Sequence, residues 1–247
     1  MTEAIQVKSL KKSFGPIHAV KGVSFDVNHG EVLGFLGPNG AGKSTTMKMI
    51  TGFLEPTAGT VLVNGHDVLE SPLAVKKSIG YLPEGAPAYG EMTVKSFLNF
   101  IADIRQLSGT NRKKRIDEVV ELINIENVFT QSIETLSKGY KRRVGLAQAI
   151  LHDPDVLILD EPTDGLDPNQ KHEVRKLIQD MAQDKAIVIS THILEEVDAV
   201  CSRAIIIAKG DLLFDGTPSE LIQKSDDANI DHAFRIITTQ GQDEVMS

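Results

Sequence analysis

GPNGAGKST, residues 37–45, is the stretch that decides the fold of this chain. A glycine is followed by four residues and then by Gly-Lys-Ser, and the stretch lies between the apolar run Val32–Leu36 and the helix-like segment Ser44–Phe53. Strand, glycine-rich loop and helix in this order predict a phosphate-binding loop, or P-loop. The alternative interpretation, an ordinary glycine-rich turn before a helix, does not require that order.

The residue types of the loop suit the oxygens of a polyphosphate. Its glycines let the backbone turn tightly with its N–H groups inward, and the next helix N-terminus adds donors. We expect Lys43 to reach the β- and γ-phosphates, Ser44 to bind Mg²⁺, and Thr45 to bond a phosphate nearer the sugar. The predicted loop contacts are Gly37, Pro38, Asn39, Gly40, Ala41, Gly42, Lys43, Ser44 and Thr45.

The composition of the chain is that of an ordinary globular protein. Its 247 residues are 41% apolar and 24% charged, and a net charge of −8 argues against broad nucleic-acid binding. The basic run Arg112–Arg115 could suggest nucleic acid or a membrane surface, but the solvated start of a helix is favoured. Cys201 is the single cysteine, so no intramolecular disulfide can form, and we expect a small buried side chain.

The hydrophobic pattern indicates where the chain resides. The N-terminal sequence MTEAIQVKSL has no signal-peptide profile, and no apolar run approaches the roughly 18 residues that span a bilayer. The chain is therefore predicted to be cytosolic or peripheral. Any membrane part of its activity must come from another polypeptide.

The apolar periodicity changes along the chain. Alternation in residues 4–10 and 19–27 predicts an antiparallel β-element, whereas helical spacing over about 91–150 predicts a helical insert. Strands then alternate with helices, which predicts a parallel sheet with helices on its faces. Residues 225–247 are polar and weakly patterned, and a loosely held tail is expected.

A second informative stretch is VLILDEP, Val156–Pro162. Four apolar residues make a buried strand, and two acids follow at the carboxyl edge where ligands of α/β proteins lie. Asp160 is suited to hold Mg²⁺ through its water shell, and Glu161 to deprotonate an attacking water as general base. Alone, such a pair would be read as a solvated turn; beside a P-loop, the functional interpretation is favoured.

Several further motifs follow in order. The stretch LSKGYKRRVGLAQAI occupies Leu136–Ile150, Asp-Gly-Leu-Asp occupies Asp164–Asp167, and His192 follows an apolar strand. Together with Phe14-Gly15, the P-loop and the Asp160 strand, these motifs make residues 4–224 resemble the nucleotide-binding domains of ATP-binding-cassette (ABC) proteins. Leu136–Ile150 is similar to the family signature, and Asp164–Asp167 to its D-loop.

The resemblance implies a fold and an activity. The fold would be α/β, a P-loop NTPase three-layer core with an N-terminal antiparallel β subdomain and an inserted α-helical subdomain at about 91–150. Residues 1–224 would form the ATP-binding domain, and 225–247 a polar C-terminal tail. The chain would be the ATPase subunit of an ABC transporter, with ATP and Mg²⁺ as its cofactors.

The resemblance also assigns site residues. Phe14 would stack on adenine, although an ordinary edge-strand aromatic is an open alternative. His192 would contact the γ-phosphate and act in catalysis with Glu161 and Lys43, and the D-loop Asp167 would belong to the nucleotide site. Ser137 and Gly139 would face the γ-phosphate bound to the opposite subunit, a role compatible with Ser137 as a helix cap.

Two positions depart from the family pattern. Lys138 and Tyr140 replace the usual second glycine and glutamine of the signature, and Lys138 could add positive charge near the partner's phosphate. Glu84 replaces the usual glutamine of the Q-loop and, when ionised, can only accept hydrogen bonds. Glu84 could still bind a water held by Mg²⁺.

The resemblance implies partners as well. Two copies, or one copy and a related cassette, would close head to tail, and a polytopic permease would hold them on the inner face of the cell membrane. Export is the implied direction, because the departures resemble bacterial cassettes that serve separate exporter-type permeases. The alternatives are a non-transport ABC ATPase of repair, translation or cluster assembly, and a binding module with a degenerate site. No nucleic-acid partner is expected.

Overall fold

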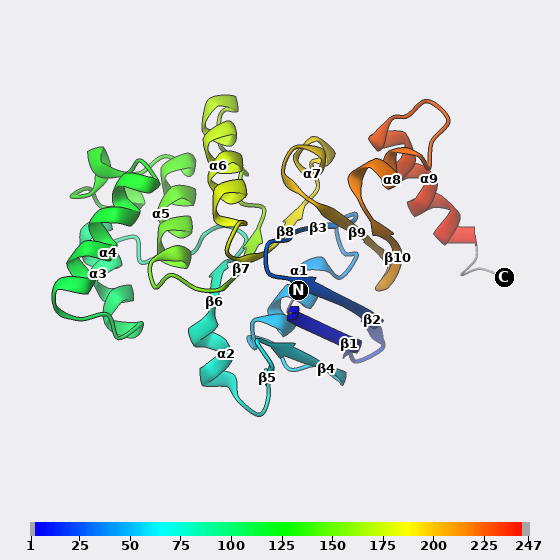
Figure 1. Ribbon diagram of the computed structural model, residues 1–247, viewed down its shortest axis with the longest axis horizontal. Helices are drawn as coiled ribbons and strands as arrows, with labels where there is room; N and C mark the ends of the chain where they lie inside the picture. The colour runs from blue at the N-terminus through cyan, green and yellow to red at the C-terminus, as the bar shows by residue number, and fades with distance from the viewer. Residues whose placement is uncertain (1–2, 244–247) are drawn as a thin grey trace.

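The computed structural model describes residues 3–243, which form two sheets and their covering helices (Figure 1). The strands are β1 (Glu3–Phe14), β2 (Ile17–Asn28), β3 (Val32–Leu36), β4 (Ala58–Val63), β5 (His66–Asp67), β6 (Ile79–Leu82), β7 (Val156–Asp160), β8 (Ala186–Thr191), β9 (Arg203–Ala208) and β10 (Asp211–Gly216). The helices are α1 (Lys43–Ile50), α2 (Pro72–Ser78), α3 (Val94–Ile104), α4 (Gly109–Leu122), α5 (Lys138–Ile150), α6 (Pro168–Met181), α7 (Leu194–Val200), α8 (Pro218–Ile222) and α9 (Ile230–Asp243). Two 3₁₀ turns, Glu126–Val128 and Ile133–Thr135, lead into α5.

The central sheet has the strand order β10-β9-β3-β8-β7-β6, with parallel pairing throughout except at β10. Its inner strands β3 and β7 are buried along their whole length and almost entirely apolar, because both faces of the sheet are covered there. Side chains alternate between the faces: Leu157 and Leu159 join one core cluster, and Val156 and Ile158 join the other. Two cores separated by one sheet give the three-layer α/β architecture predicted from the sequence.

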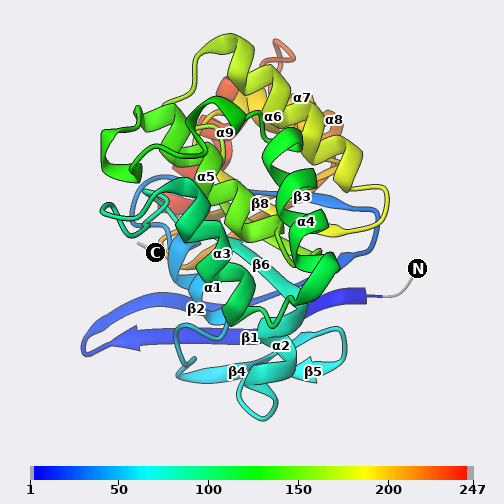
Figure 2. The same cartoon turned by 90° about the vertical axis from the view of Figure 1, so that its left-hand side faces the viewer.

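The second sheet is antiparallel, with the strand order β2-β1-β4-β5. It lies below the central sheet in Figure 2, with α1 between the two. Its inward side chains, among them Ile5, Val23 and Val61, share a core with Met47 of α1. The antiparallel β-element predicted before the P-loop is therefore confirmed, and it includes the hairpin from β4 to β5.

Helices α3, α4 and α5 gather at one end of the molecule, at the left of Figure 1. Apolar residues at helical spacing, such as Phe97, Leu98, Ile116 and Val119, bury their side chains there and join the core on the α6 side of the central sheet. The predicted helical insert is present, whereas the exact limits of the subdomain and of the ATP-binding domain stay predictions.

The C-terminal part differs from the expected loose tail. Residues 230–243 form α9, and Ala233 is fully buried, with Phe234 and Ile237 packed on the same core. These residues repeat at helical spacing, a pattern that the polar composition of the segment obscured. Residues 244–247 of the expected tail lie outside the described part of the chain.

Cys201 is buried, and burial raises the pKa of its thiol to about 12. Its sulfur lies 2.9 Å from where a side chain on Gly34 would begin, which shows how closely α7 approaches β3.

Across residues 3–243, none of the helices combines the length and the apolar character that crossing a membrane requires.

Candidate nucleotide site

Four neighbouring strands of the central sheet end at one edge. The register pairs Leu36 of β3 with Thr191 of β8, and Asp160 of β7 with Ser190 of β8. The segments that follow β3, β8, β7 and β6 therefore begin side by side. Because ligands of open α/β sheets bind outside the carboxyl ends of the strands, this edge is the expected site.

A cavity of about 300 Å³ lies at this edge. It brings together the P-loop with three acidic side chains that are distant in sequence. Its lining residues are Ala19, Asn39, Gly40, Ala41, Gly42, Lys43, Ser44, Thr45, Glu84, Asp160 and Glu161. Positive, hydroxyl and carboxylate groups thus face one space of a size suited to a phosphate chain and its counterion.

Lys43 is buried in the P-loop, with 8% of its surface exposed. Its ammonium donates to the carbonyl oxygens of Gly37, at 2.6 Å, and Pro38, at 3.2 Å. Burial lowers the pKa of Lys43, and the nearby carboxylates of Glu161, Asp160 and Glu84 oppose that effect. Gly37 and Pro38 themselves are not lining residues, so their side of the loop serves to hold Lys43.

Two glycines of the loop are required by close backbone contacts. A Cβ on Gly37 would lie 2.1 Å from the carbonyl oxygen of Ile207, and a Cβ on Gly42 2.5 Å from that of Ala19. Gly42 also has a φ of +108°, which strongly favours glycine, at the position just before α1. The packing of the loop against β9 and β2 therefore fixes its shape.

The acidic pair at the end of β7 has two different environments. Asp160 is 2% exposed and accepts a hydrogen bond from the Ser190 hydroxyl. Glu161 has a φ of +52°, and its Oε1 lies 2.8 Å from Nδ1 of His192. His192 does not line the cavity itself, but it contacts the carboxylate of Glu161, which does. The Asp160 carboxylate thus contacts β8, whereas the Glu161 carboxylate contacts His192, the residue that follows β8.

The signature residues lie apart from this cavity. Ser137 caps α5, with its hydroxyl accepting from the backbone N–H of Tyr140 at 3.3 Å. Gly139 is buried against Leu166 of the D-loop and Gln170 of α6, so close that a Cβ would lie 2.8 Å from the Gln170 amide oxygen. Neither residue lines the cavity of its own chain.

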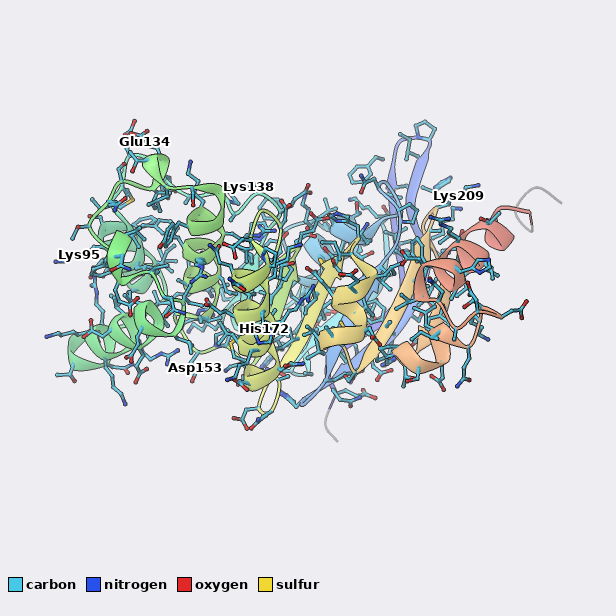
Figure 3. All side chains as sticks on the ribbon, turned by 90° about the horizontal axis from the view of Figure 1, so that it is seen from above. Lys95, Glu134, Lys138, Asp153, His172 and Lys209 are labelled. Carbon is cyan, nitrogen blue, oxygen red and sulfur yellow. The ribbon has the colours of Figure 1, made fainter. Side chains whose placement is uncertain are left out.

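Lys138 is held by the D-loop of the same chain. Its ammonium lies 2.8 Å from a carboxylate oxygen of Asp164, its side chain covers Gly165, and Figure 3 shows it beside α6. Hydrogen bonding to Lys138 holds the pKa of the Asp164 carboxyl below its usual range. In this arrangement its charge is paired with Asp164 of the same chain, and the added positive charge near a partner's phosphate stays a prediction.

Phe14 and Asp167 have local partners. Phe14 lies at the turn between β1 and β2, is 48% exposed, and has the Lys12 ammonium 5.2 Å from the centre of its ring. Ala19, further along β2, lines the cavity instead. Asp167 caps α6 by accepting from the backbone N–H of Gln170 at 3.0 Å.

Sequence reasoning missed two buried charged residues beside the site. The Glu196 carboxylate accepts hydrogen bonds from the hydroxyls of Thr163 and Thr191, and so joins the segments that precede the D-loop and His192. Arg142 of α5 donates to backbone carbonyls at the ends of β6 and β7. The available signal for each was a charged residue on the apolar stripe of a helix.

Comparison with known proteins identifies the family. The family model described as ABC transporter matches residues 20–164. The ATP-binding protein YxlF of Bacillus subtilis, described as an uncharacterized ABC transporter protein, is 39% identical over 220 residues, which cover 89% of this chain and 73% of YxlF. YbhF of Escherichia coli, a probable multidrug ABC transporter ATP-binding protein, is 37% identical over 222 residues, 90% of this chain but only 38% of YbhF.

A solved structure extends the similarity to the whole fold. The structure described as the ATP binding subunit of an ABC transporter superposes with a TM-score of 0.88 at 29% identity, over 95% of this chain and 99% of the other. Family model, relatives and fold agree with the motifs gathered at the carboxyl edge of the central sheet. This chain belongs to the ABC transporter family as an ATP-binding subunit, and members of that family are ATPases.

Proposed function

We propose that this chain hydrolyses MgATP at the cavity beside the P-loop and drives a separate membrane permease. The observation that carries the proposal is the convergence of Lys43, Asp160 and Glu161 on one cavity at the ends of β3 and β7. A P-loop alone supports nucleotide binding, whereas the adjoining carboxylates add groups that can hold a metal and activate water.

Mg²⁺ fits the oxygen donors of this cavity. Ser44 offers a hydroxyl, and Asp160 and Glu84 offer carboxylates, all lining the same space. Mg²⁺ is usually bound through one or two carboxylates, retained waters and substrate phosphates, which matches this small set. When bound with ATP, the ion would neutralise charge that develops on the phosphates.

The protein groups divide the remaining work. The P-loop N–H groups and Lys43 bind and orient the phosphates, so that the γ-phosphate can be attacked in line. Glu161 accepts the proton of the attacking water, and His192, at 2.8 Å from Glu161, orients that carboxylate and reaches toward the γ-phosphate. Phe14 is proposed only as an adenine contact, which requires its exposed ring to meet the base.

The metal role of Asp160 can be tested by the replacement Asp160→Asn. Asparagine keeps an acceptor for the Ser190 hydroxyl but loses the charge, so we expect the half-saturating Mg²⁺ concentration for hydrolysis to rise roughly 10- to 100-fold. The control is Asp155→Asn. Asp155 directly precedes β7, at the end of the strand opposite to Asp160, and its carboxylate accepts a hydrogen bond from the Asn64 side-chain amide. Equal Mg²⁺ requirements of the two variants would remove Asp160 from the metal site.

A second copy is proposed to complete the site. Ser137 and Gly139 lie at the N-terminus of α5, away from the cavity of their own chain, where free N–H groups attract anions. Head-to-tail pairing would bring this helix end to the γ-phosphate on the other subunit, with Asp167 of the D-loop nearby. A related cassette could occupy the place of the second copy.

We propose that closing and reopening of the paired subunits drives transport, most simply export, from the cytoplasmic face of the cell membrane. YbhF, at 37% identity, is named a multidrug ABC transporter protein, and this supports the export class. The tagged chain, isolated from its own organism after detergent extraction, should carry a polytopic membrane protein with it. Recovery only as an ATP-hydrolysing assembly without such a protein would favour the non-transport alternative.

A further inference from the structure

Arg142 is a buried cation beside the nucleotide site with no role assigned so far. It lies on α5, five residues after the cap residue Ser137, and is 4% exposed. Burying a guanidinium is costly unless its N–H groups find partners. The partners of Arg142 therefore show what this position requires.

The partners are carbonyl oxygens of two separate segments. Nη1 donates to Pro83 at 3.1 Å, and Nη2 donates to Asp160 at 2.6 Å and also to Glu161. Pro83 directly precedes Glu84, and Asp160 ends β7. One planar group thus joins α5 to both segments that bring carboxylates to the cavity.

The contact with Glu161 meets an unusual backbone conformation. Glu161 has a φ of +52°, a left-handed conformation that residues with a Cβ adopt uncommonly. Its N–H donates to the carbonyl of Ser190 at 3.0 Å, and its own carbonyl accepts from Arg142. The peptide groups on both sides of Glu161 are therefore anchored, one to β8 and the other to α5.

We infer that Arg142 is a positioning residue that holds the Asp160–Glu161 backbone in this turn and links it to the helix carrying Ser137. The kinetic part of the inference rests on the proposed role of Glu161 as general base. The link runs within one chain from its own cavity to the helix end proposed to serve the other subunit. Arg142 thereby couples the position of this helix end to that of the turn at Glu161.

Arg142→Lys tests this role with the positive charge retained. An ammonium is a point donor and cannot span three carbonyls as a planar guanidinium does. We expect kcat for ATP hydrolysis to fall about tenfold or more, because general-base catalysis depends on geometry, while the Kd for ATP changes less than threefold. The measurement is steady-state turnover alongside calorimetric nucleotide binding.

Arg143→Lys is the matched control. Arg143 follows on the same helix, is 8% exposed, and donates to the carbonyl of Ile123 at 3.1 Å and to Glu173 at 2.9 Å, away from the cavity. Both variants should lose similar thermal stability, but Arg143→Lys should keep kcat within threefold of the parent. Equal kcat values for the two variants would overturn the inference. If Arg142→Lys does not fold, Arg142→Gln, with a neutral amide donor, is held to the same criterion.

A double mutant separates positioning from a general structural effect. If Arg142 acts through the Glu161 carboxylate, Arg142→Lys should leave the residual single-turnover rate of Glu161→Gln unchanged within threefold. A further fall by the factor seen in the parent would show independent action and contradict the inference. Should Glu161→Gln alone retain full turnover, the proposed general base is wrong, whatever Arg142 does.

Discussion

Glu161→Gln is expected to lower kcat for ATP hydrolysis by about 10²–10⁴-fold while ATP binding persists. The amide cannot take a proton from water, but it has nearly the shape of the carboxylate and can still bond His192, which lies 2.8 Å away in the parent. The Lys43 contacts are made by the loop and do not pass through Glu161. Binding and chemistry should therefore separate in this variant.

The same variant tests the proposed pairing of two copies. With hydrolysis blocked and ATP retained, a head-to-tail dimer should accumulate on size-exclusion chromatography when ATP is added. Glu195→Gln is the control, because Glu195 is exposed on α7 three residues after His192. Its turnover should match the parent, and normal turnover of Glu161→Gln would exclude the role assigned to that carboxylate.

The parts of the fold that the sequence predicted are those governed by local pattern. Val156–Leu159 is apolar because both faces of a parallel sheet are buried, and this predicted strand ends within one residue of the observed β7. Segment 230–243 was harder, since its few apolar residues become buried only after β9, β10 and α8 form the surface that receives them.

In the nucleotide site, too, the features that could be predicted are those contained in a local sequence motif. The P-loop is one continuous motif, and its lysine and glycines could be assigned from spacing and order alone. The positions of Arg142 and Glu196 could not, because their partners are carbonyls and hydroxyls of segments distant in sequence. The Lys138 ion pair with Asp164 likewise depends on how α5 and the D-loop meet. Backbone acceptors leave no mark in a sequence, so contacts of this kind need coordinates.

Lys43→Met should weaken ATP binding roughly 10- to 100-fold without destabilising the fold. A hydrogen bond to a charged group contributes about 1.5–3 kcal/mol, which corresponds to that range of Kd. The folded chain, by contrast, buries the ammonium, and burial lowers the Lys43 pKa, so the charged form is disfavoured there relative to the unfolded chain. The methionine keeps an apolar stem without that charge.

ATP affinity should fall in Lys43→Met while the stability of the nucleotide-free protein does not, and this difference distinguishes a binding residue from a structural one. Without added nucleotide, the melting temperature of Lys43→Met should equal or exceed that of the parent, whereas calorimetry should show the loss of ATP affinity. Lys48→Met, exposed on the same helix α1, should change neither quantity appreciably. A lower melting temperature with normal affinity would mean that the hydrogen bonds from Lys43 to Gly37 and Pro38 mainly stabilise the loop. Lower affinity with unchanged or increased stability would instead show that the buried charge is retained for the phosphates.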